Sequence, residues 1–139
     1  MKPDAWHAWF CVQAGWTHPT RTWLYQQAGL AHPIQREAKR LHPSIKGSEA
    51  AHARAVLEVG CGTGVIAAEI AFQSRLSAPD RLRSALSQAH VVGLDLDSEM
   101  LAFARGQEGD VRYVQGDAHT LPFPDGAFDV AVCHYLLLW

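Results

Sequence analysis

A short apolar run that breaks into three alternate glycines constrains the fold of this chain most strongly. The run covers residues 55–59, the glycines are Gly60, Gly62 and Gly64, and a predicted helix follows at 65–76. Glycine suits such a turn because a Cβ atom would disfavour positive φ angles and block the approach of a ligand to the backbone. Strand, glycine turn and helix in this order bring backbone N–H groups close to a nucleotide-like ligand.

The rest of the chain divides into three segments. Residues 1–30 are predicted to be helical, residues 31–54 are predicted to be a linker with two prolines, one glycine and little periodicity, and residues 55–139 hold the regular part of the pattern. Within the first segment, we expect helices at 4–14 and 19–28, with Thr17 as a cap between them and Gly29-Leu30 as the C-terminal stop.

From residue 55 onward, apolar strands alternate with helices. Strands are predicted at 55–59, 90–95, 111–115 and 128–133, and helical segments at 65–76, 80–89 and 98–105. This alternation indicates βαβ crossovers and a parallel sheet, the α/β class. Because the strands are almost continuously apolar, we expect both faces of the sheet to be covered.

Three acids lie at or just after the ends of successive strands. Glu58 precedes the glycines, Asp95 ends the second strand and Asp117 follows the third. Ligands bind at the carboxyl edge of such sheets. The spacing G-x-G-x-G, with Asp95 placed 31 residues beyond Gly64, departs from the dinucleotide fingerprint and disfavours an NAD-dependent oxidoreductase. Glu58 instead suits a ligand that carries an ammonium group.

Composition excludes several other classes. The net charge of −2 gives no basic surface for nucleic acid. The three cysteines are far apart, so neither a disulfide framework nor a metal site is expected. No apolar stretch is long enough to cross a membrane and no signal peptide is recognisable, which favours a cytoplasmic protein.

Four motifs resemble those of a known family. They are Val56–Gly64, Val91–Asp97, Gln115–Ala118 and Leu121–Asp129. In this order they resemble the class I S-adenosylmethionine-dependent methyltransferases, and within them the methyltransferase type 11 domain. The resemblance implies a Rossmann-like α/β fold, with a partial parallel sheet in the order 3-2-1-4 and flanking helices. It also implies S-adenosylmethionine as cofactor and a small-molecule methyl acceptor.

The resemblance implies contacts for the methionine and ribose parts of this cofactor. The backbone of Gly60, Cys61 and Gly62 would pass the methionine part, Glu58 would hold its ammonium, and Asp95 would bind the ribose hydroxyls.

It also implies contacts for the adenine and the methyl acceptor. Leu96 would lie against the adenine ring, Asp117 would bind its amine, and the Ala118 N–H would bind a ring nitrogen. His134 would face the sulfonium and the substrate. If the acceptor must lose a proton, His134 and His119 are the candidate bases, with His134 the better placed.

Four tryptophans in the N-terminal segment, Trp6, Trp9, Trp16 and Trp23, form a stripe. We expect them to pack in the core, with a substrate cleft as the alternative.

The family's sheet has seven strands, whereas this chain reaches only the fourth. We therefore expect a truncated chain, in which strand 128–133 is an open edge that a partner chain could cover. The alternative to a methyltransferase is then a non-catalytic or truncated fragment, or a partner subunit, that binds S-adenosylmethionine without activity of its own.

Overall fold

Four parallel strands form the sheet at the centre of the molecule. The structure is a computed structural model that describes residues 2–30, 55–76, 90–107 and 109–134. Its strands are β1 (Ala55–Val59), β2 (His90–Asp95), β3 (Val111–Gln115) and β4 (Val130–Cys133). Their order is β3-β2-β1-β4 and all pairs are parallel, which confirms the predicted order.

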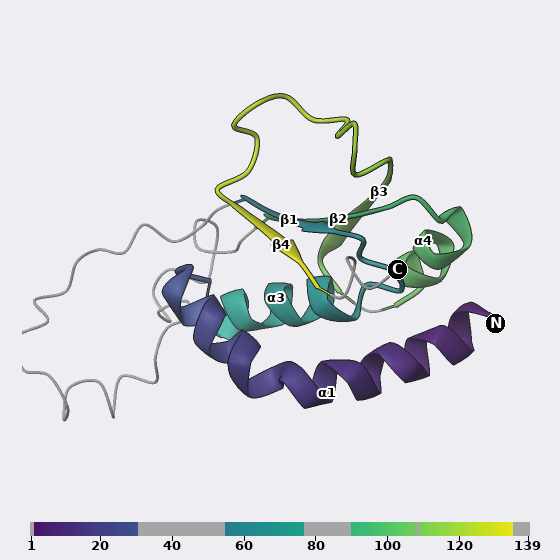
Figure 1. Ribbon diagram of the computed structural model, residues 1–139, viewed down its shortest axis with the longest axis horizontal. Coiled ribbons are helices and arrows are strands. Elements are labelled where there is room, and N and C mark those ends of the chain that lie inside the picture. Colours follow the sequence, from purple (N-terminus) through teal and green to yellow (C-terminus); the bar gives the residue numbers. More distant parts are fainter. Residues whose placement is uncertain (1, 31–54, 77–89, 108, 135–139) are drawn as a thin grey trace, which may run out of the picture.

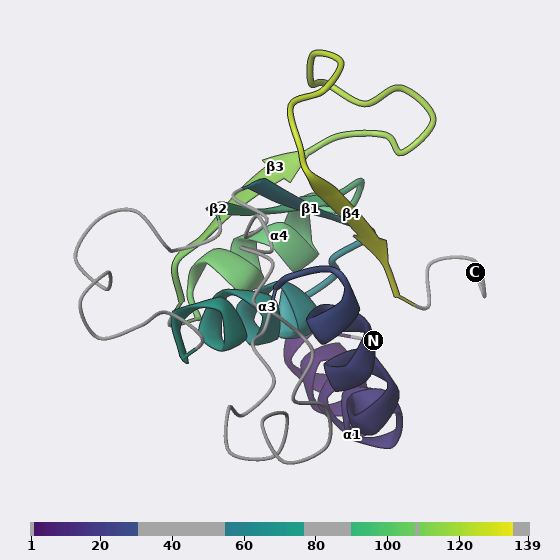
Figure 2. The same ribbon diagram turned by 90° about the vertical axis from the view of Figure 1, so that its left-hand side faces the viewer.

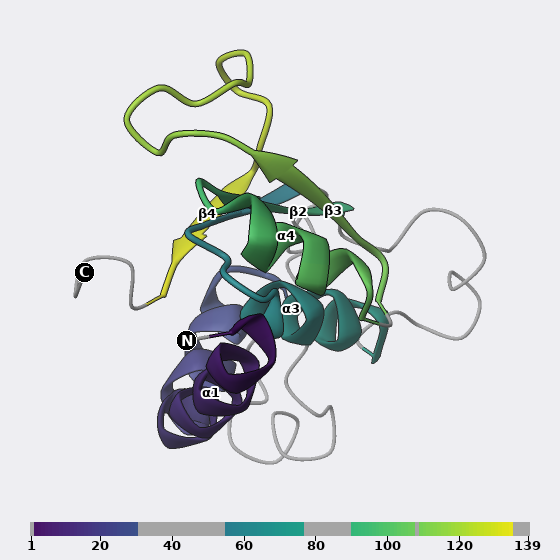
Figure 3. The ribbon, with the colours of Figure 1, turned by 90° about the vertical axis from the view of Figure 1, so that its right-hand side faces the viewer.

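The three described helices lie on one face of this sheet (Figures 1 and 2). α3 (Val65–Leu76) and α4 (Ser98–Arg105) form the layer next to the strands, and α1 (Pro3–Gln27) forms an outer layer against them. Figure 3 shows the same three layers from the opposite side. Strands and helices share a core of mostly small and branched apolar side chains, together with one tyrosine: Ala14, Tyr25, Leu30, Val56, Ile66, Ala67, Ile70, Ala71 and Val91.

The start of α4 is fixed by Asp97, which is its N-cap residue. Its Oδ1 accepts hydrogen bonds from the backbone N–H groups of Glu99 at 2.8 Å and Met100 at 3.3 Å. Such a cap satisfies donors that have no partner within the helix. Because α4 begins directly after β2, the cap also sets the direction of the chain as it leaves the sheet edge.

α1 is a single helix from Pro3 to Gln27, so the prediction of two helices, with Thr17 as a cap, is wrong. The interior residue Pro19 cannot donate to the Gly15 carbonyl, which normally favours a break. Nearby, however, the Arg21 guanidinium donates to the Ala14 carbonyl at 2.7 Å and ties α1 to α3. Packing against a neighbouring helix thus outweighs the local signal.

The predicted end of α1 is confirmed. Gly29 has φ of 72°, and its N–H donates to the Gln26 carbonyl at 3.2 Å. The Leu30 N–H donates to the Tyr25 carbonyl at 2.8 Å. These two bonds form a Schellman motif, in which the buried Leu30 supplies the hydrophobic contact.

β4 begins at Val130, two residues later than the predicted 128–133. The Asp129 carboxylate accepts a hydrogen bond from the Ala55 N–H at 2.9 Å, and its own N–H donates to the Ala55 carbonyl. The Phe128 ring packs edge-on against Phe123. Residues 128–129 therefore lead into the strand and are not part of it. The predicted linker 31–54 and helix 80–89 lie outside the described residues.

Three tryptophans of the predicted stripe are not in the core. Trp9, Trp16 and Trp23 are 43%, 64% and 56% exposed, so the expectation of core packing is wrong for them. The Trp9 and Trp16 rings meet edge to face on the outer side of α1, with centroids 5.7 Å apart. Trp6 lies elsewhere, at the pocket described below.

Candidate functional site

The glycine turn is built at the carboxyl end of β1. Gly60, Gly62 and Gly64 all have positive φ angles, of 72°, 52° and 80°. The N–H groups of Gly60 and Cys61 both donate to the Leu94 carbonyl near the end of β2, at 2.8 and 3.0 Å. The turn therefore curls over the sheet edge and is held against the neighbouring strand.

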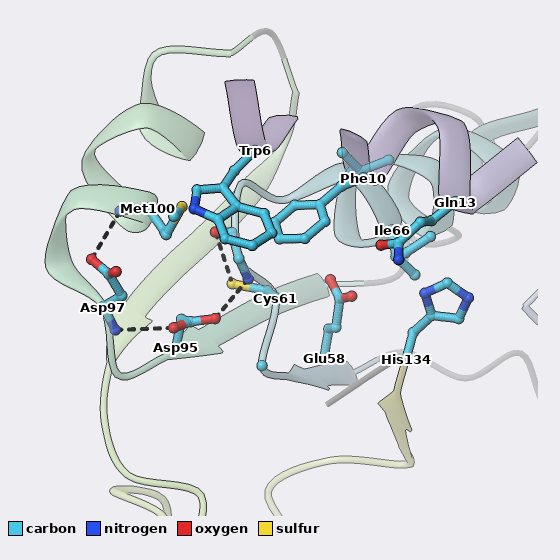
Figure 4. A pocket seen from close by; sticks show the side chains of 13 residues that line it. Trp6, Phe10, Gln13, Glu58, Cys61, Ile66, Asp95, Asp97, Met100 and His134 are labelled. Carbon is cyan, nitrogen blue, oxygen red and sulfur yellow. Dashed lines mark hydrogen bonds between the residues drawn. The ribbon is translucent and has the colours of Figure 1, made fainter. Parts of the chain in front are cut away.

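A pocket of about 420 Å³ opens beside this turn (Figure 4). Its walls come from the ends of three strands, the starts of α3 and α4, and the first half of α1. The lining residues are Trp6, Phe10, Gln13, Glu58, Gly60, Cys61, Gly62, Val65, Ile66, Asp95, Asp97, Met100 and His134. These residues include three carboxylates and neither Lys nor Arg, so within the described part of the chain the lining favours a cation.

Glu58 is the most unusual group in the pocket. The residue is only 2% exposed, and its Oε2 has no hydrogen-bond partner among the described residues. Burial raises the pKa of Glu58 well above its ordinary value, while the backbone N–H of Ala67 partly opposes that shift. Burying a carboxyl group without a partner costs free energy. This oxygen is therefore ready to accept a hydrogen bond from a cationic ligand.

Asp95 holds the glycine turn in addition to lining the pocket. Its Oδ2 accepts a hydrogen bond from the Gly62 N–H at 2.7 Å. Its Oδ1 accepts one from the Asp97 N–H at 2.9 Å. Each carboxylate oxygen has further lone pairs for a ligand. One side chain thus links the turn, the end of β2 and the start of α4.

His134 follows β4 and enters the pocket from the side opposite Asp95 (Figure 4). Its Nε2 lies 2.9 Å from the Thr17 hydroxyl oxygen of α1. Burial, followed by the nearby charge of Arg21, lowers the pKa of His134, while Glu69 opposes the shift. The imidazole is therefore neutral over a wider pH range than an exposed histidine.

Aromatic side chains of α1 cover the pocket. Trp6 and Phe10 are stacked, with ring centroids 5.4 Å apart. A Cβ atom placed on Gly62 would lie 2.9 Å from the Phe10 ring, so only glycine lets α1 come this close. The helical spacing of Trp6, Phe10 and Gln13 could have predicted a shared face, but nothing in it pointed to the glycine turn.

Six of the nine predicted site residues line this one pocket: Glu58, Gly60, Cys61, Gly62, Asp95 and His134. Sequence reasoning gave no ligand role to the other seven lining residues, of which only Trp6 was considered for a cleft.

Leu96, Asp117 and Ala118 are not among the lining residues. The Leu96 side chain is 67% exposed. The Asp117 carboxylate accepts hydrogen bonds from the backbone N–H of His119 at 2.8 Å and from its ring at 2.9 Å. These bonds lower the pKa of Asp117. His119 is not among the lining residues either, and it pairs with Asp117 at the surface.

The described residues hold neither a metal site nor a membrane-spanning helix. No three His, Cys, Asp or Glu side chains among them gather closely enough to hold a metal ion. None of the helices seen there has both the length and the hydropathy needed to cross a bilayer.

Comparison with known proteins gives consistent matches. The sequence profile of the methyltransferase domain family matches residues 56–139. A demethylmenaquinone methyltransferase of Deinococcus radiodurans is 36% identical over 86 residues, which cover 59% of this chain and 31% of the relative. A fatty-acid O-methyltransferase of Mycolicibacterium smegmatis is 34% identical over 101 residues, which cover 71% of this chain and 32% of the relative.

A ubiquinone/menaquinone biosynthesis C-methyltransferase of Stutzerimonas stutzeri is 36% identical over 103 residues, which cover 70% of this chain and 35% of the relative. The chain spans about a third of the length of these curated relatives. Among solved structures, an S-adenosylmethionine-dependent methyltransferase from Mesorhizobium loti aligns with a TM-score of 0.45 and 24% identity, over 75% of this chain and 40% of that one.

Proposed function

We propose, from the premise that this chain belongs to the methyltransferase domain family, that its pocket binds S-adenosylmethionine for methyl transfer to a small, largely apolar acceptor. S-adenosylmethionine is the cofactor of the family. The observation that carries the assignment to this pocket is the buried, unpartnered Oε2 of Glu58 beside the glycine turn.

The residues present fit this cofactor in two respects. The Glu58 carboxyl can pair with the ammonium of the methionine part, which would give its buried Oε2 a hydrogen-bond partner. The missing side chain at Gly62 leaves the backbone open to the ligand, where a Cβ atom would meet Phe10. A pocket lined by Glu58, Asp95 and Asp97 also suits a ligand whose sulfonium and ammonium are both positive.

The chain's own residues would then bind and orient. The backbone of Gly60, Cys61 and Gly62 would border the methionine part, and the free lone pairs of Asp95 would accept the ribose hydroxyls. For the adenine, the proposed contacts are Leu96, Asp117 and the Ala118 N–H. These three residues lie outside the pocket lining.

The bound cofactor supplies a methyl group that is already activated by the adjacent sulfonium. The protein therefore needs chiefly to hold the acceptor in line with that methyl group, which is worth several kcal/mol without a special catalytic side chain. Trp6 and Phe10 would exclude water from this region, and His134 lines the same pocket. We assign His134 the contact with the acceptor.

An apolar acceptor is favoured by the aromatic cover and by the relatives. Trp6, Phe10 and Ile66 form an apolar wall of the pocket. Two of the matched relatives are named for quinone biosynthesis and one for fatty acids. We propose a molecule of this general kind, a small compound with one polar group on an apolar body.

Isothermal titration calorimetry with S-adenosylmethionine and S-adenosylhomocysteine tests cofactor binding. Because apo Glu58 has a raised pKa, an incoming ammonium should drive its proton into the buffer. The measured heat near neutral pH should then depend on the ionisation enthalpy of the buffer, and Glu58→Gln should remove that dependence. Absence of heat with both compounds would contradict the proposal.

Three variants locate the cofactor. Asp95→Ala should weaken binding about 10-fold or more, the usual effect of losing hydrogen bonds to a charged group. Asp117→Ala tests the proposed adenine contact. Asp110→Ala is the matched control, because this exposed carboxylate pairs with Arg75 at the surface and does not line the pocket. Unchanged affinity in Asp95→Ala would remove its ribose role.

Transfer of a tritiated methyl group to a panel of hydroxyquinones and fatty acids tests the acceptor class. We expect incorporation into at least one of these compounds that is lost in Glu58→Gln. Binding without transfer to any member of the panel would leave the cofactor assignment intact and contradict the proposed acceptor.

A further inference from the structure

A chain of polar contacts joins α3, α1 and the end of β4 behind the pocket. The Arg21 guanidinium contacts the Glu69 carboxylate of α3 at 2.5 Å and the Ala14 carbonyl at 2.7 Å. The same guanidinium donates a short hydrogen bond to the Thr17 hydroxyl. The Thr17 hydroxyl lies 2.9 Å from His134 Nε2. This series of polar contacts therefore ends at the histidine that faces the proposed acceptor.

The direction of these hydrogen bonds follows from what each group can donate. Arginine has only donors, so the Thr17 oxygen must accept from Arg21. A hydroxyl has one proton, and His134 Nε2 is the only acceptor within reach of it in the described part of the chain. The Thr17 O–H therefore donates to Nε2, because the reverse arrangement would leave a half-buried hydroxyl proton without an acceptor.

We propose that Arg21 and Thr17 fix His134 as the neutral tautomer with its proton on Nδ1, so that the ring does not act as a base toward the methyl acceptor. The role of His134 toward the methyl acceptor rests on the proposed function, whereas the tautomer depends only on the chain of hydrogen bonds. Thr17 is in this view a positioning residue: it acts on the acceptor only through His134.

The charges around the ring agree with a neutral imidazole. Arg21 of α1 faces it and opposes a second positive charge, and burial acts in the same direction. Glu69 of α3 opposes both, but it is already paired with Arg21. Glu58 of β1 lines the same pocket, with a raised pKa that favours its uncharged form. His134 should therefore become protonated only below the ordinary value of about 6.5.

The tautomer narrows the class of acceptor. A general base needs a free lone pair, and here the Nε2 lone pair is engaged by Thr17. The acceptor must then reach the pocket without needing His134 to remove a proton. This condition favours groups that are ionised near neutral pH, such as a carboxylate or an acidic phenol or enol.

Nuclear magnetic resonance of the 139-residue protein with ¹⁵N-labelled histidine tests the tautomer directly. Long-range ¹H–¹⁵N correlation distinguishes a protonated ring nitrogen from an unprotonated one, and the His134 signals are assigned by their loss in His134→Asn. We expect Nδ1 protonated and Nε2 unprotonated at pH 7. A protonated Nε2, or a mixture of both tautomers in the wild type, would overturn the proposal.

Substitutions at Thr17 test whether its hydroxyl fixes the His134 tautomer. Thr17→Val should release the tautomer and give averaged signals, whereas Thr17→Ser should restore the wild-type pattern. Thr22→Val is the control, since the Thr22 hydroxyl donates only to the His18 carbonyl in the same exposed turn of α1. An unchanged pattern in a folded Thr17→Val protein would contradict the role of Thr17. Since no cofactor is added, a negative calorimetry result would leave this test unaffected.

Discussion

Glu58 shows how one buried carboxyl group can make the stability of the fold depend on pH. Its folded pKa is raised, mainly by burial, so the native state holds a proton that the unfolded chain releases above about pH 4.3. The associated stability is fully present below that pH and is lost as pH rises through the folded pKa. The loss approaches about 1.4 kcal/mol per pH unit within this window.

The first prediction concerns Glu58→Gln. The amide keeps an acceptor for the Ala67 N–H but does not titrate, so the free energy of unfolding of the variant should fall less between pH 5 and 8 than that of the wild type. Urea unfolding at several pH values measures the difference. Parallel pH profiles for the two proteins would show that Glu58 ionises as freely in the folded state as in the unfolded chain.

The second prediction separates two costs of replacing glycine. Gly64 and Gly126 both have positive φ, but a Cβ atom at Gly64 would fall on the Tyr113 hydroxyl, whereas at Gly126 it meets nothing within 4 Å. Gly126→Ala should cost about 1–2 kcal/mol of backbone strain, and Gly64→Ala clearly more. Gly15→Ala, in open space within α1, should stabilise by up to about 1 kcal/mol.

Thermal and chemical unfolding of these three variants give the comparison. Equal losses at Gly64 and Gly126 would mean that Tyr113 moves aside at no cost.

At the same scale, the sequence predicted the site residues on the strand ends and missed those on α1. Glu58, Gly62 and Asp95 could be found because strand, turn and spacing already identify a sheet edge. Phe10 and Gln13 carry no such mark: a helical face of aromatic and polar side chains fits many neighbours. Only the way α1 docks brings that face to the glycine turn.

At the scale of elements, α1 shows where local sequence rules fail. Gly15, Thr17 and Pro19 are a reasonable signature for a break between two helices. The helix nevertheless continues, because Arg21 contacts Glu69 on α3 and also bonds back to the Ala14 carbonyl. That ion pair spans 48 residues of sequence, a distance over which periodicity gives no information.

The third prediction is that this ion pair determines how α1 packs on α3 and adds little to the free energy of unfolding. Both side chains are largely buried, yet Arg21 Nε and Glu69 Oε1 have no hydrogen-bond partners among the described residues. Arg21→Met should cost about 3 kcal/mol, because it leaves Glu69 as an unpaired charge. Adding Glu69→Leu should recover most of the loss.

Urea unfolding of the two single variants and the double variant completes the cycle. A double variant that is no more stable than Arg21→Met would show instead that the bonds from Arg21 to α1 itself hold the helix in place.

At the scale of the whole molecule, strand order was predictable and layering was not. Alternating strands and helices from residue 55 onward indicated a parallel sheet, and the resemblance supplied the order β3-β2-β1-β4, which is confirmed. That α1 would form an outer layer over α3 and α4 (Figure 2) could not be read from the sequence. Its apolar residues, spread around the helix, do not single out one buried face.

This layering leads to the fourth prediction, that the cofactor should order α1. Residues Trp6, Phe10 and Gln13 of α1 line the same pocket as Glu58, so a ligand there can bind well only when the helix is docked. Binding to the native state adds about 2.7 kcal/mol at a ligand concentration 100 times Kd. Hydrogen exchange by mass spectrometry should therefore slow by about 10-fold or more in residues 5–13 when S-adenosylhomocysteine is added.

Residues 110–112, at and just before the amino end of β3, are the internal control, since none of them lines the pocket. Glu58→Gln is the control for specificity, because it should weaken both the binding and the protection at the same ligand concentration. Saturating ligand that protected the turn 60–64 but left residues 5–13 unchanged would mean that α1 is not part of the binding site. The helix would then be a structural cover, and the acceptor would have to approach from another side of the pocket.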